Sequence, residues 1–269
     1  MLTDPDRAAE ALGAIALEAA RFLAAVQDRT LGHKVKDDGT PSTAADVEAE
    51  RIVLARLAER FPGIHVVAEE SASACATPSG LYFLVDPLDG TRDYLTGRGE
   101  YSVNVALVDG RRPIAAALAV PVLGRVWAAG RHCRVAPIPI AGDCSAWTIV
   151  TTRRAPETGP VALVSRRHGD EATETCLGKL GIGGRVTASS AAKFGLIASG
   201  EADVYVRCGP TMEWDTAAGD HIVTAAGGIV LGPDGAQLTY GHAGRGYLNG
   251  AFVALGDRSL EGKVDLAAA

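Results

Sequence analysis

The sequence predicts an α+β fold whose second half alternates strands and helices in the α/β manner. Two segments with helical spacing open the chain, and two apolar strands around the turn Asp109-Gly110 then indicate antiparallel sheet. After residue 160 strands and helices follow one another in turn, which favours an α/β arrangement. With 269 residues, the chain is long enough for one large domain or for two smaller ones that share a seam.

The start of the chain is expected to form two helices. Apolar side chains recur at helical spacing over residues 7–27, which predicts a first amphipathic helix. After a loop rich in Gly, Lys and Asp, a second helix is expected from about Thr43 to Phe61, because Pro62-Gly63 then ends it.

Strands account for most of the remaining first half. The segment "IHVVAEE" is typical of a strand that ends in Glu69 and Glu70, and "LYFLV" of a buried strand that ends in Asp86. Two strands around Asp109-Gly110 and a third near "RVWAAG" complete the predicted antiparallel sheet.

Residues 136–160 are rich in Pro, Thr and Gly and lack a clear period, so they are the best candidate for a boundary. We therefore expect an N-terminal α+β part over residues 1–135 and a C-terminal α/β part over residues 136–269. The C-terminal elements are expected in the order strand "VALVS", helix 170–180, strand near Val186, helix 190–199, strand "ADVYVR", helix 215–226 and strand "GGIVL".

Composition and charge exclude several classes of protein. Apolar residues make up 47% and charged residues 22%, which indicates a globular chain. The net charge of −6 and the lack of a Lys/Arg-rich run argue against nucleic-acid binding. Acidic residues interrupt the alanine-rich first helix, so neither a signal peptide nor a membrane span is expected. Five scattered cysteines without a C-x-x-C pair predict neither a disulfide framework nor a zinc site, and a reducing cytoplasm is expected.

Four acidic residues, Glu69, Asp86, Asp89 and Asp215, lie where predicted elements begin or end. Such positions are where functional sites are commonly built. Two carboxylates about 4 Å apart repel by roughly 4 kcal/mol at an effective dielectric constant near 20. Several such pairs are tolerable only if protons or cations neutralise them, so a magnesium site is the interpretation we favour.

The segment Asp86–Thr91 suggests what this metal would act on. Pro87 fixes the backbone, and Gly90 removes the side chain that would block the close approach of a ligand. A short helix is expected from Arg92, so the amides of Gly90 and Thr91 would point towards an anion. Hard oxygen ligands beside such amides predict Mg²⁺ together with a phosphate ester.

Ordinary structural roles remain open for most of these residues taken singly. An isolated D-x-x-D-G-T is compatible with an Asx turn, and Asp215 with an N-cap of the helix that follows it. Asp46 lies three residues after Thr43, the spacing of a capping box. Glu70 is interpreted as a solvated neighbour of Glu69.

Taken together, the motifs "VVAEES", "DPLDGT" and "WDTAAG" resemble the inositol-monophosphatase-like superfamily of Mg²⁺-dependent, lithium-sensitive phosphatases. Their order and spacing cover residues 43–228. The resemblance implies the layered α-β-α-β-α sandwich of that superfamily. The further segments "GTPSTAAD", "SRRH", "YVRCGPTMEWDTAAGD" and "YLNGAF" are similar to its CysQ-type branch, the 3'(2'),5'-bisphosphate nucleotidases. That branch removes the 3'-phosphate of adenosine 3',5'-bisphosphate and of its sulfated form during sulfate assimilation.

The resemblance also implies roles for individual residues. Two or three Mg²⁺ ions would be held by Glu69, Asp86, the Leu88 carbonyl, Asp89 and Asp215, with Asp86 bridging two of them and a third ion near Glu69 and Asp46. Asp46 and Thr91 would orient the attacking water. The substrate would be contacted by Gly90, Thr91, His168, Ser190, Lys193, Arg207 and Asp215. For His168 and Lys193, a surface charge is the structural alternative; Arg207 ends a strand before Gly-Pro, which favours a functional role.

The expected partner is a small nucleotide bisphosphate, without nucleic acid or an integral membrane segment, and the chain is expected to be a monomer or a homodimer. An inositol-1-phosphatase or a broad sugar-phosphate phosphatase with the same metals is the alternative within the enzyme class. A catalytically silent nucleotide or metal sensor is the alternative outside it. Thr91 and the complete acidic set count against a sensor, which needs no hydroxyl to position water.

Overall fold

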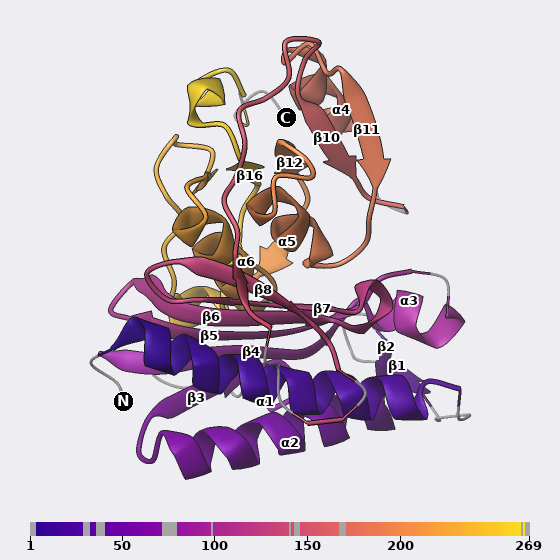
Figure 1. Ribbon diagram of the computed structural model, residues 1–269, viewed down its shortest axis with the longest axis vertical. Coiled ribbons are helices and arrows are strands. Elements are labelled where there is room, and N and C mark those ends of the chain that lie inside the picture. Colours follow the sequence, from indigo (N-terminus) through magenta and orange to yellow (C-terminus); the bar gives the residue numbers. More distant parts are fainter. Residues whose placement is uncertain are drawn as a thin grey trace.

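Two helices cover one face of a large sheet in the first part of the computed structural model (Figure 1). The structure describes residues 4–28, 33–35, 41–71, 80–97, 99–139, 141–142, 146–166, 171–264 and 266. Helix α1 spans Pro5–Val26 and α2 spans Ala44–Arg60. The hydroxyl of Thr43 and the carboxylate of Asp46 form the predicted capping box at the start of α2, which fixes where that helix begins.

The large sheet has seven strands, and its order follows the sequence from β3 to β9. Every neighbouring pair is antiparallel except β3 and β4, which are parallel. The strands are β3 (His65–Ala68), β4 (Leu81–Asp89), β5 (Ser102–Asp109), β6 (Arg112–Val120), β7 (Arg125–Ala129), β8 (Cys133–Pro137) and β9 (Thr148–Ile149). Alternate side chains face opposite sides, so Phe83 and Val85 pack in the core with α1 and α2, while Tyr82 and Leu84 belong to a second core on the other face.

A second sheet of five strands lies beyond that second core, with the order β11-β10-β12-β16-β14. Its strands β10, β11 and β12 are mutually parallel where they pair, whereas β16 is antiparallel to both of its neighbours. The strands are β10 (Val161–Val164), β11 (Gly184–Thr187), β12 (Val204–Arg207), β14 (Ile229–Leu231) and β16 (Phe252–Leu255).

Helices α5 (Ala192–Ala198) and α6 (Glu213–Ala225) lie between the two sheets, and α4 (Glu171–Gly178) covers the far side of the second sheet (Figure 1). The molecule is therefore layered as α-β-α-β-α, and the predicted fold class is confirmed. Two glycines allow the middle layer to pack closely. A Cβ at Gly219 would lie 2.2 Å from the ring of Phe194, and one at Gly195 would lie 2.9 Å from Trp127.

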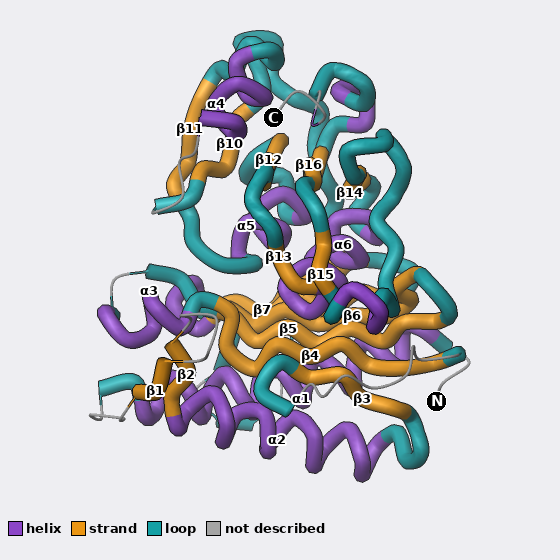
Figure 2. Tube along the Cα trace, turned by 180° about the vertical axis from the view of Figure 1, so that it is seen from behind, coloured by secondary structure: helices purple, strands orange, loops and turns teal. Residues whose placement is uncertain are grey.

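Shorter elements lie in the segments between these helices and strands. They are the paired strands β1 (His33–Val35) and β2 (Pro41–Thr43), helix α3 (Thr91–Thr96), the paired strands β13 (Thr211–Met212) and β15 (Leu248–Asn249), and the 3₁₀ helices η1 (Pro121–Leu123), η2 (Ala243–Arg245) and η3 (Arg258–Leu260). Among them, β1, β2, α3, β13 and β15 are labelled in the view from behind (Figure 2). The chain passes from the first sheet to the second between β9 and β10, within residues 136–160. The division into two domains stays a prediction.

Three local predictions need correction. Strand β4 does not end in Asp86 but continues to Asp89 through a register shift, because Pro87 cannot donate to the ladder. Helix α5 begins at Ala192, not near Ser190, whose backbone is left-handed (φ 56°). Asp215 is not the N-cap of α6; Met212 holds that position, and Asp215 lies three residues further on.

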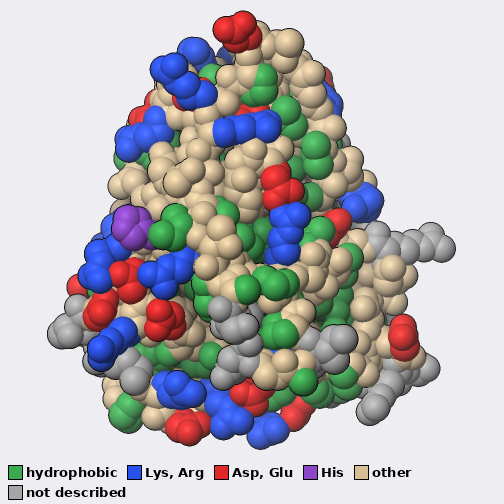
Figure 3. Space-filling view, viewed as in Figure 1, with side chains coloured by type: hydrophobic (Ala, Val, Ile, Leu, Met, Phe, Trp, Pro, Cys, Tyr) green, Lys and Arg blue, Asp and Glu red, His purple; other side chains and the backbone are tan. Residues whose placement is uncertain are grey.

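The distribution of surface charge and the hydrophobicity of the helices can be compared with what the composition predicts. On the face shown in Figure 3, acidic and basic side chains are intermingled and form no continuous basic stripe. No helix within the described ranges has both the length and the apolar character that crossing a bilayer requires.

Candidate active site

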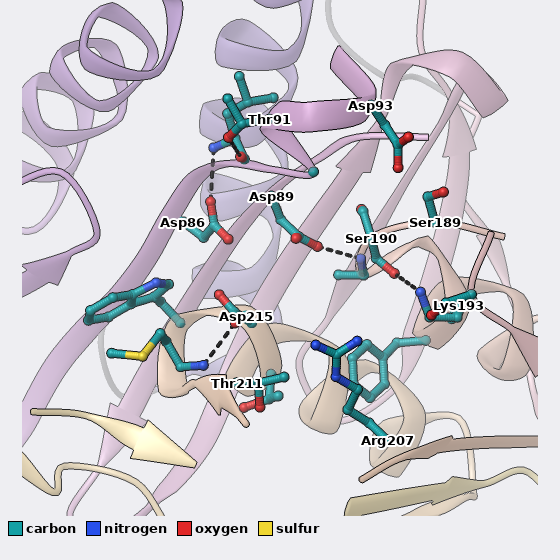
Figure 4. Close-up of a pocket in the computed structure, with 18 of the residues that line it drawn as sticks. Asp86, Asp89, Thr91, Asp93, Ser189, Ser190, Lys193, Arg207, Thr211 and Asp215 are labelled. Atoms are coloured by element: carbon teal, nitrogen blue, oxygen red, sulfur yellow. Dashed lines mark hydrogen bonds between the residues drawn. The ribbon is translucent and has the colours of Figure 1, made fainter. Parts of the chain in front are cut away.

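One pocket of about 560 Å³ opens where the ends of β4 and β12 meet the starts of α3, α5 and α6. It contains the predicted acidic residues on one side and cationic side chains on the other (Figure 4). Its lining includes Glu69, Asp86, Leu88, Asp89, Gly90, Thr91, Arg92, Asp93, Ser165, Arg166, Ser189, Ser190, Lys193, Tyr205, Arg207, Thr211, Met212, Trp214 and Asp215. Residues from both halves of the sequence therefore build this one site.

The end of β4 supplies the central carboxylates. Asp86 is buried, and one of its oxygens accepts a hydrogen bond from the Leu88 amide at 3.0 Å, which is the Asx turn that the sequence left open. The register shift after Asp86 brings Asp89 opposite Ser102 on β5. Asp86 can therefore form the Asx turn and also belong to the acidic cluster, because the turn uses only one of its two carboxylate oxygens.

The carboxylates of Asp86 and Asp215 strongly disfavour their charged forms. Burial, followed by the charges of Glu69, Asp89 and Asp215, raises the pKa of Asp86 well above its usual range. Burial and the Asp89 charge raise the pKa of Asp215 to about 8. These shifts have the sign expected when several acids face one another without a neutralising cation.

Backbone amides hold the remaining acids in place. The Ala191 amide donates to Asp89 at 2.6 Å, and the Met212 amide donates to Asp215 at 2.8 Å. Glu69 follows β3, and its amide donates to the Val85 carbonyl at 3.1 Å, which places it beside the end of β4. Within the described residues, no three Asp, Glu, His or Cys side chains converge closely enough to form a metal-ligand set by themselves.

Thr91 and Asp46 interact directly. The Thr91 hydroxyl lies 3.0 Å from one Asp46 oxygen and 3.1 Å from the Leu88 carbonyl oxygen, and its single hydrogen can be donated to one of them at a time. The other Asp46 oxygen accepts the amide and hydroxyl of Thr43 in the capping box. Burial raises the pKa of Asp46 despite these hydrogen bonds. One carboxylate therefore starts α2 and also reaches the pocket residue Thr91.

Three cationic side chains of the second half line the same pocket, Arg166, Lys193 and Arg207. Lys193 is only 3% exposed, its ammonium donates to the Ser190 carbonyl at 2.8 Å, and it lies 4.7 Å from the centre of the Tyr205 ring. Burial lowers the pKa of Lys193 to about 8. The Arg207 Nε is buried and has no hydrogen-bond partner in the described part of the chain. Lys193 thus supports the loop at Ser190, whereas Arg207 keeps donor capacity on the pocket wall.

Not every predicted site residue is placed by the structure. His168 lies outside the described residues. Glu70 does not line the pocket; its carboxylate accepts the Ser42 hydroxyl at 2.9 Å, so it is more than a solvated neighbour. The other predicted residues, Glu69, Asp86, Leu88, Asp89, Gly90, Thr91, Ser190, Lys193, Arg207 and Asp215, line the pocket, and Asp46 contacts it through Thr91.

Sequence reasoning missed three residues at the site. The Ser102 hydroxyl lies 2.6 Å from that of Ser190, the Glu100 carboxylate accepts the Ser189 amide at 2.8 Å, and Arg166 pairs with Glu100. The predicted antiparallel pairing could have indicated Glu100 and Ser102. Because β5 runs antiparallel to β4, the residues at and just before the start of β5 must lie beside Asp89 at the end of β4.

Comparison of the sequence with known proteins identifies a family of phosphatases. The model of the inositol monophosphatase family matches residues 3–261. A protein of Salmonella typhimurium named 3'(2'),5'-bisphosphate nucleotidase CysQ is 35% identical over 209 residues, which cover 76% of this chain and 81% of that protein. Its counterpart in Shigella flexneri is 34% identical over the same shares.

Solved structures show the same fold. The crystal structure of CysQ from Bacteroides thetaiotaomicron, a bacterial member of the inositol monophosphatase family, has a TM-score of 0.80 and 29% identity, and covers 94% of this chain and 98% of that one. An inositol monophosphatase of Thermotoga maritima has a TM-score of 0.74 at 18% identity, covers 94% of this chain and 93% of that one, and shows the fold alone. The resemblance predicted from the motifs is confirmed: the chain belongs to the inositol monophosphatase family.

Proposed function

We propose that this protein is a Mg²⁺-dependent phosphatase that removes the 3'-phosphate of adenosine 3',5'-bisphosphate, giving AMP, and acts likewise on the sulfated form of that nucleotide. The observation that carries the proposal is one pocket that combines four acidic side chains with Lys193 and Arg207. The relatives named 3'(2'),5'-bisphosphate nucleotidase support the choice of substrate. A nucleotide with two phosphates needs cations in addition to a metal, and Arg207 supplies one on the wall opposite the acids.

The donor set fits magnesium. Asp86, Asp89 and Asp215 each accept a backbone amide with one oxygen, so their second oxygens can face a cation. Mg²⁺ commonly binds through one or two carboxylates and completes its shell with water and substrate phosphate, so a full trio of protein ligands is not required. The side-chain amide of Asn104, which pairs with Asp86 across β4 and β5, is buried without a hydrogen-bond partner among the described residues.

We assign Glu69, Asp86, the Leu88 carbonyl, Asp89 and Asp215 as the residues that would hold two or three Mg²⁺ ions, with a third ion near Glu69 and Asp46. When bound, such ions lower the pKa of water and stabilise charge on the transferring phosphoryl group. A cation near Asp86 and Asp215 would also favour their ionised forms and relieve the repulsion that raises their pKa values.

The chain's own groups would then orient the reactants. The Thr91 hydroxyl, which donates its single hydrogen to Asp46, would accept a hydrogen bond from the attacking water. The amides of Gly90 and Thr91 would donate to the phosphate, because the first amides of helix α3 have no acceptor within the helix. Gly90 has φ 92°, and a Cβ there would lie 3.1 Å from the Glu100 carbonyl, so glycine suits this backbone position.

The nucleotide would extend from this phosphate towards Ser190 and Arg207, with Lys193 holding Ser190 in position and His168 contributing from outside the described residues. We place the reaction in the cytoplasm, in sulfate assimilation, and expect a monomer or a homodimer. Among the described residues, Cys133, Cys176 and Cys208 form no disulfide, which is compatible with a reducing compartment.

Phosphate release tests the proposal. Purified protein should release phosphate faster from adenosine 3',5'-bisphosphate than from inositol 1-phosphate at equal concentration. It should lose this activity in EDTA and recover it when Mg²⁺ is added. Millimolar lithium should inhibit it. Asp89→Asn should abolish turnover while thermal unfolding stays cooperative. Asp109→Asn is the matched control, because Asp109 is exposed beside Gly110 and Asn-Gly suits such a turn. Equal or faster inositol phosphate hydrolysis would overturn the nucleotide assignment, and full activity without metal would overturn the metal assignment.

A further inference from the structure

Glu100 connects two pocket residues, Arg166 and Ser189, that follow the different strands β10 and β11. Its carboxylate accepts the Ser189 amide at 2.8 Å, and its two oxygens lie 3.1 and 3.2 Å from the same nitrogen, Nη2, of Arg166. The Glu100 side chain is 12% exposed and the Arg166 side chain is 42% exposed. A largely buried carboxylate of the first half thus holds one backbone group and one exposed cation of the second half.

Arg166 keeps free donors at the pocket. It lines the same cavity as Asp86 and Thr91, and only its Nη2 has a partner in the described part of the chain. A guanidinium carries five N–H donors, so Nε and Nη1 remain available to an anion, and a planar guanidinium suits a phosphate. Lys193, by contrast, already donates to the Ser190 and Ala188 carbonyls.

The position of Arg166 relative to the acids follows from the intervening contacts. The Glu100 carbonyl and the Ser190 side chain both lie on the side of Gly90 where a Cβ would project, 3.1 and 3.3 Å from that position. Gly90, Thr91 and Arg166 line one pocket of about 560 Å³, and Glu100 joins the segment beside Gly90 to Arg166. An anionic group elsewhere on a substrate whose first phosphate lies at Gly90 and Thr91 would share this pocket with the Arg166 guanidinium.

We propose that Arg166 is a specificity-determining residue that contacts the second phosphate of a bisphosphate substrate, and that Glu100 is the positioning residue that fixes its guanidinium. The inference rests on the proposed function, because it requires a substrate with two phosphates. A substrate that lacks the second phosphate gains nothing from Arg166, so this residue separates the two substrate classes through binding and leaves the chemical step unchanged.

The test compares adenosine 3',5'-bisphosphate with adenosine 3'-monophosphate, which differs only by the second phosphate. Arg166→Gln should raise KM for the bisphosphate at least tenfold, change KM for the monophosphate less than twofold, and leave kcat for both within twofold. Arg92→Gln is the matched control, since Arg92 is an exposed arginine of the same pocket lining without an ion pair among the described residues. It should change the ratio of the two KM values less than threefold.

Glu100→Gln tests the positioning role. The single amide oxygen would accept the Ser189 amide, and the NH₂ group would then face the guanidinium, so Arg166 would lose its fixed orientation. We expect a KM for the bisphosphate at least threefold higher in the native background and less than 1.5-fold higher in the Arg166→Gln background. Thermal unfolding of every variant shows that it is folded.

The outcomes separate this inference from the proposed function. If the unaltered protein releases no phosphate from the bisphosphate, the proposed function fails and this inference falls with it. If it does release phosphate, but Arg166→Gln affects both substrates equally or no more than Arg92→Gln does, the inference alone is wrong. Equal effects of Glu100→Gln in both backgrounds would refute the positioning role of Glu100.

Discussion

The raised pKa of Asp215 predicts that the metal-free protein loses stability as the pH rises. In the folded protein this carboxyl is protonated below about pH 8, whereas in the unfolded chain it is ionised above about pH 4. Unfolding therefore releases a proton between these values. A group whose pKa is higher in the folded state stabilises that state at low pH, and its contribution is lost as the pH rises through the folded-state pKa.

The size of the effect follows from the linkage relation. One proton changes the free energy of unfolding by about 1.4 kcal/mol per pH unit, so between pH 6 and pH 8, where the titration is half complete, the loss is about 2 kcal/mol. For a chain of this length about 1 kcal/mol corresponds to roughly 2–4 °C, so the unfolding temperature should fall by about 4–8 °C. Asp215→Asn removes the titrating group and should remove most of this slope.

The assay is thermal unfolding in EDTA at pH 6, 7 and 8 for the native protein and for Asp215→Asn. Asp46, Asp220 and His221, whose pKa values are also shifted, are present in both proteins and cancel in the difference between the two curves. Asp86 does not cancel, because the Asp215 charge contributes to its raised pKa, so its response is part of the measured difference. Excess Mg²⁺ should flatten the native curve, because a bound cation favours the ionised carboxylates. The same slope in both metal-free proteins, or a native stability that rises from pH 6 to pH 8, would refute the reasoning.

Two further predictions concern single contacts. Thr91→Val removes the hydroxyl beside Asp46 and should lower kcat about 100-fold, the lower end of the range for a lost proton-handling group. Thr91→Ser keeps the hydroxyl and should keep most of the activity. Phosphate release measures both variants, and a fully active valine variant would contradict the water-orienting role of Thr91. Lys193→Met leaves the Ser190 carbonyl without its donor and should lower the free energy of unfolding by about 1–3 kcal/mol. Urea unfolding measures this change. An unchanged midpoint of the urea transition would show that Lys193 does not support the loop at Ser190.

Local patterns explain why most of the fold could be predicted. Helices α1 and α2 have clear apolar spacing, and α2 has the Thr43–Asp46 capping box at its start. The strands β4, β5 and β6 are continuous apolar runs punctuated by a turn. These signals lie within a few residues of one another, and no distant contact is needed to interpret them.

The errors lie where distant contacts decide the backbone. Ser190 adopts a left-handed backbone beside Asp89, Ser102 and Lys193, all of which hold its loop. No local pattern around residue 190 reports those contacts, so the start of α5 was predicted two residues too early.

The side-chain pairs at the pocket were unpredictable for a related reason. Glu100 and Arg166 are 66 residues apart, and nothing near either of them reveals the other. The acidic motifs, in contrast, could be found because each marks the end of a recognisable strand or the start of a helix. The sequence therefore predicts the acidic side of the pocket better than the Glu100–Arg166 pair on its other side.

Asp89 connects these two sides of the site. One of its oxygens accepts the Ala191 amide at 2.6 Å, so the loop that carries Ser190 is attached to a residue of the acidic cluster. Any cation that draws the Asp89 carboxylate towards Asp86 also changes the hydrogen bond that holds this loop. Since Glu100 anchors the neighbouring Ser189 amide, the loop has a second attachment that does not depend on the acids. In the proposed function, metal binding and substrate choice would thus be linked through Asp89, and the Glu100–Ser189 hydrogen bond would limit how far the loop follows.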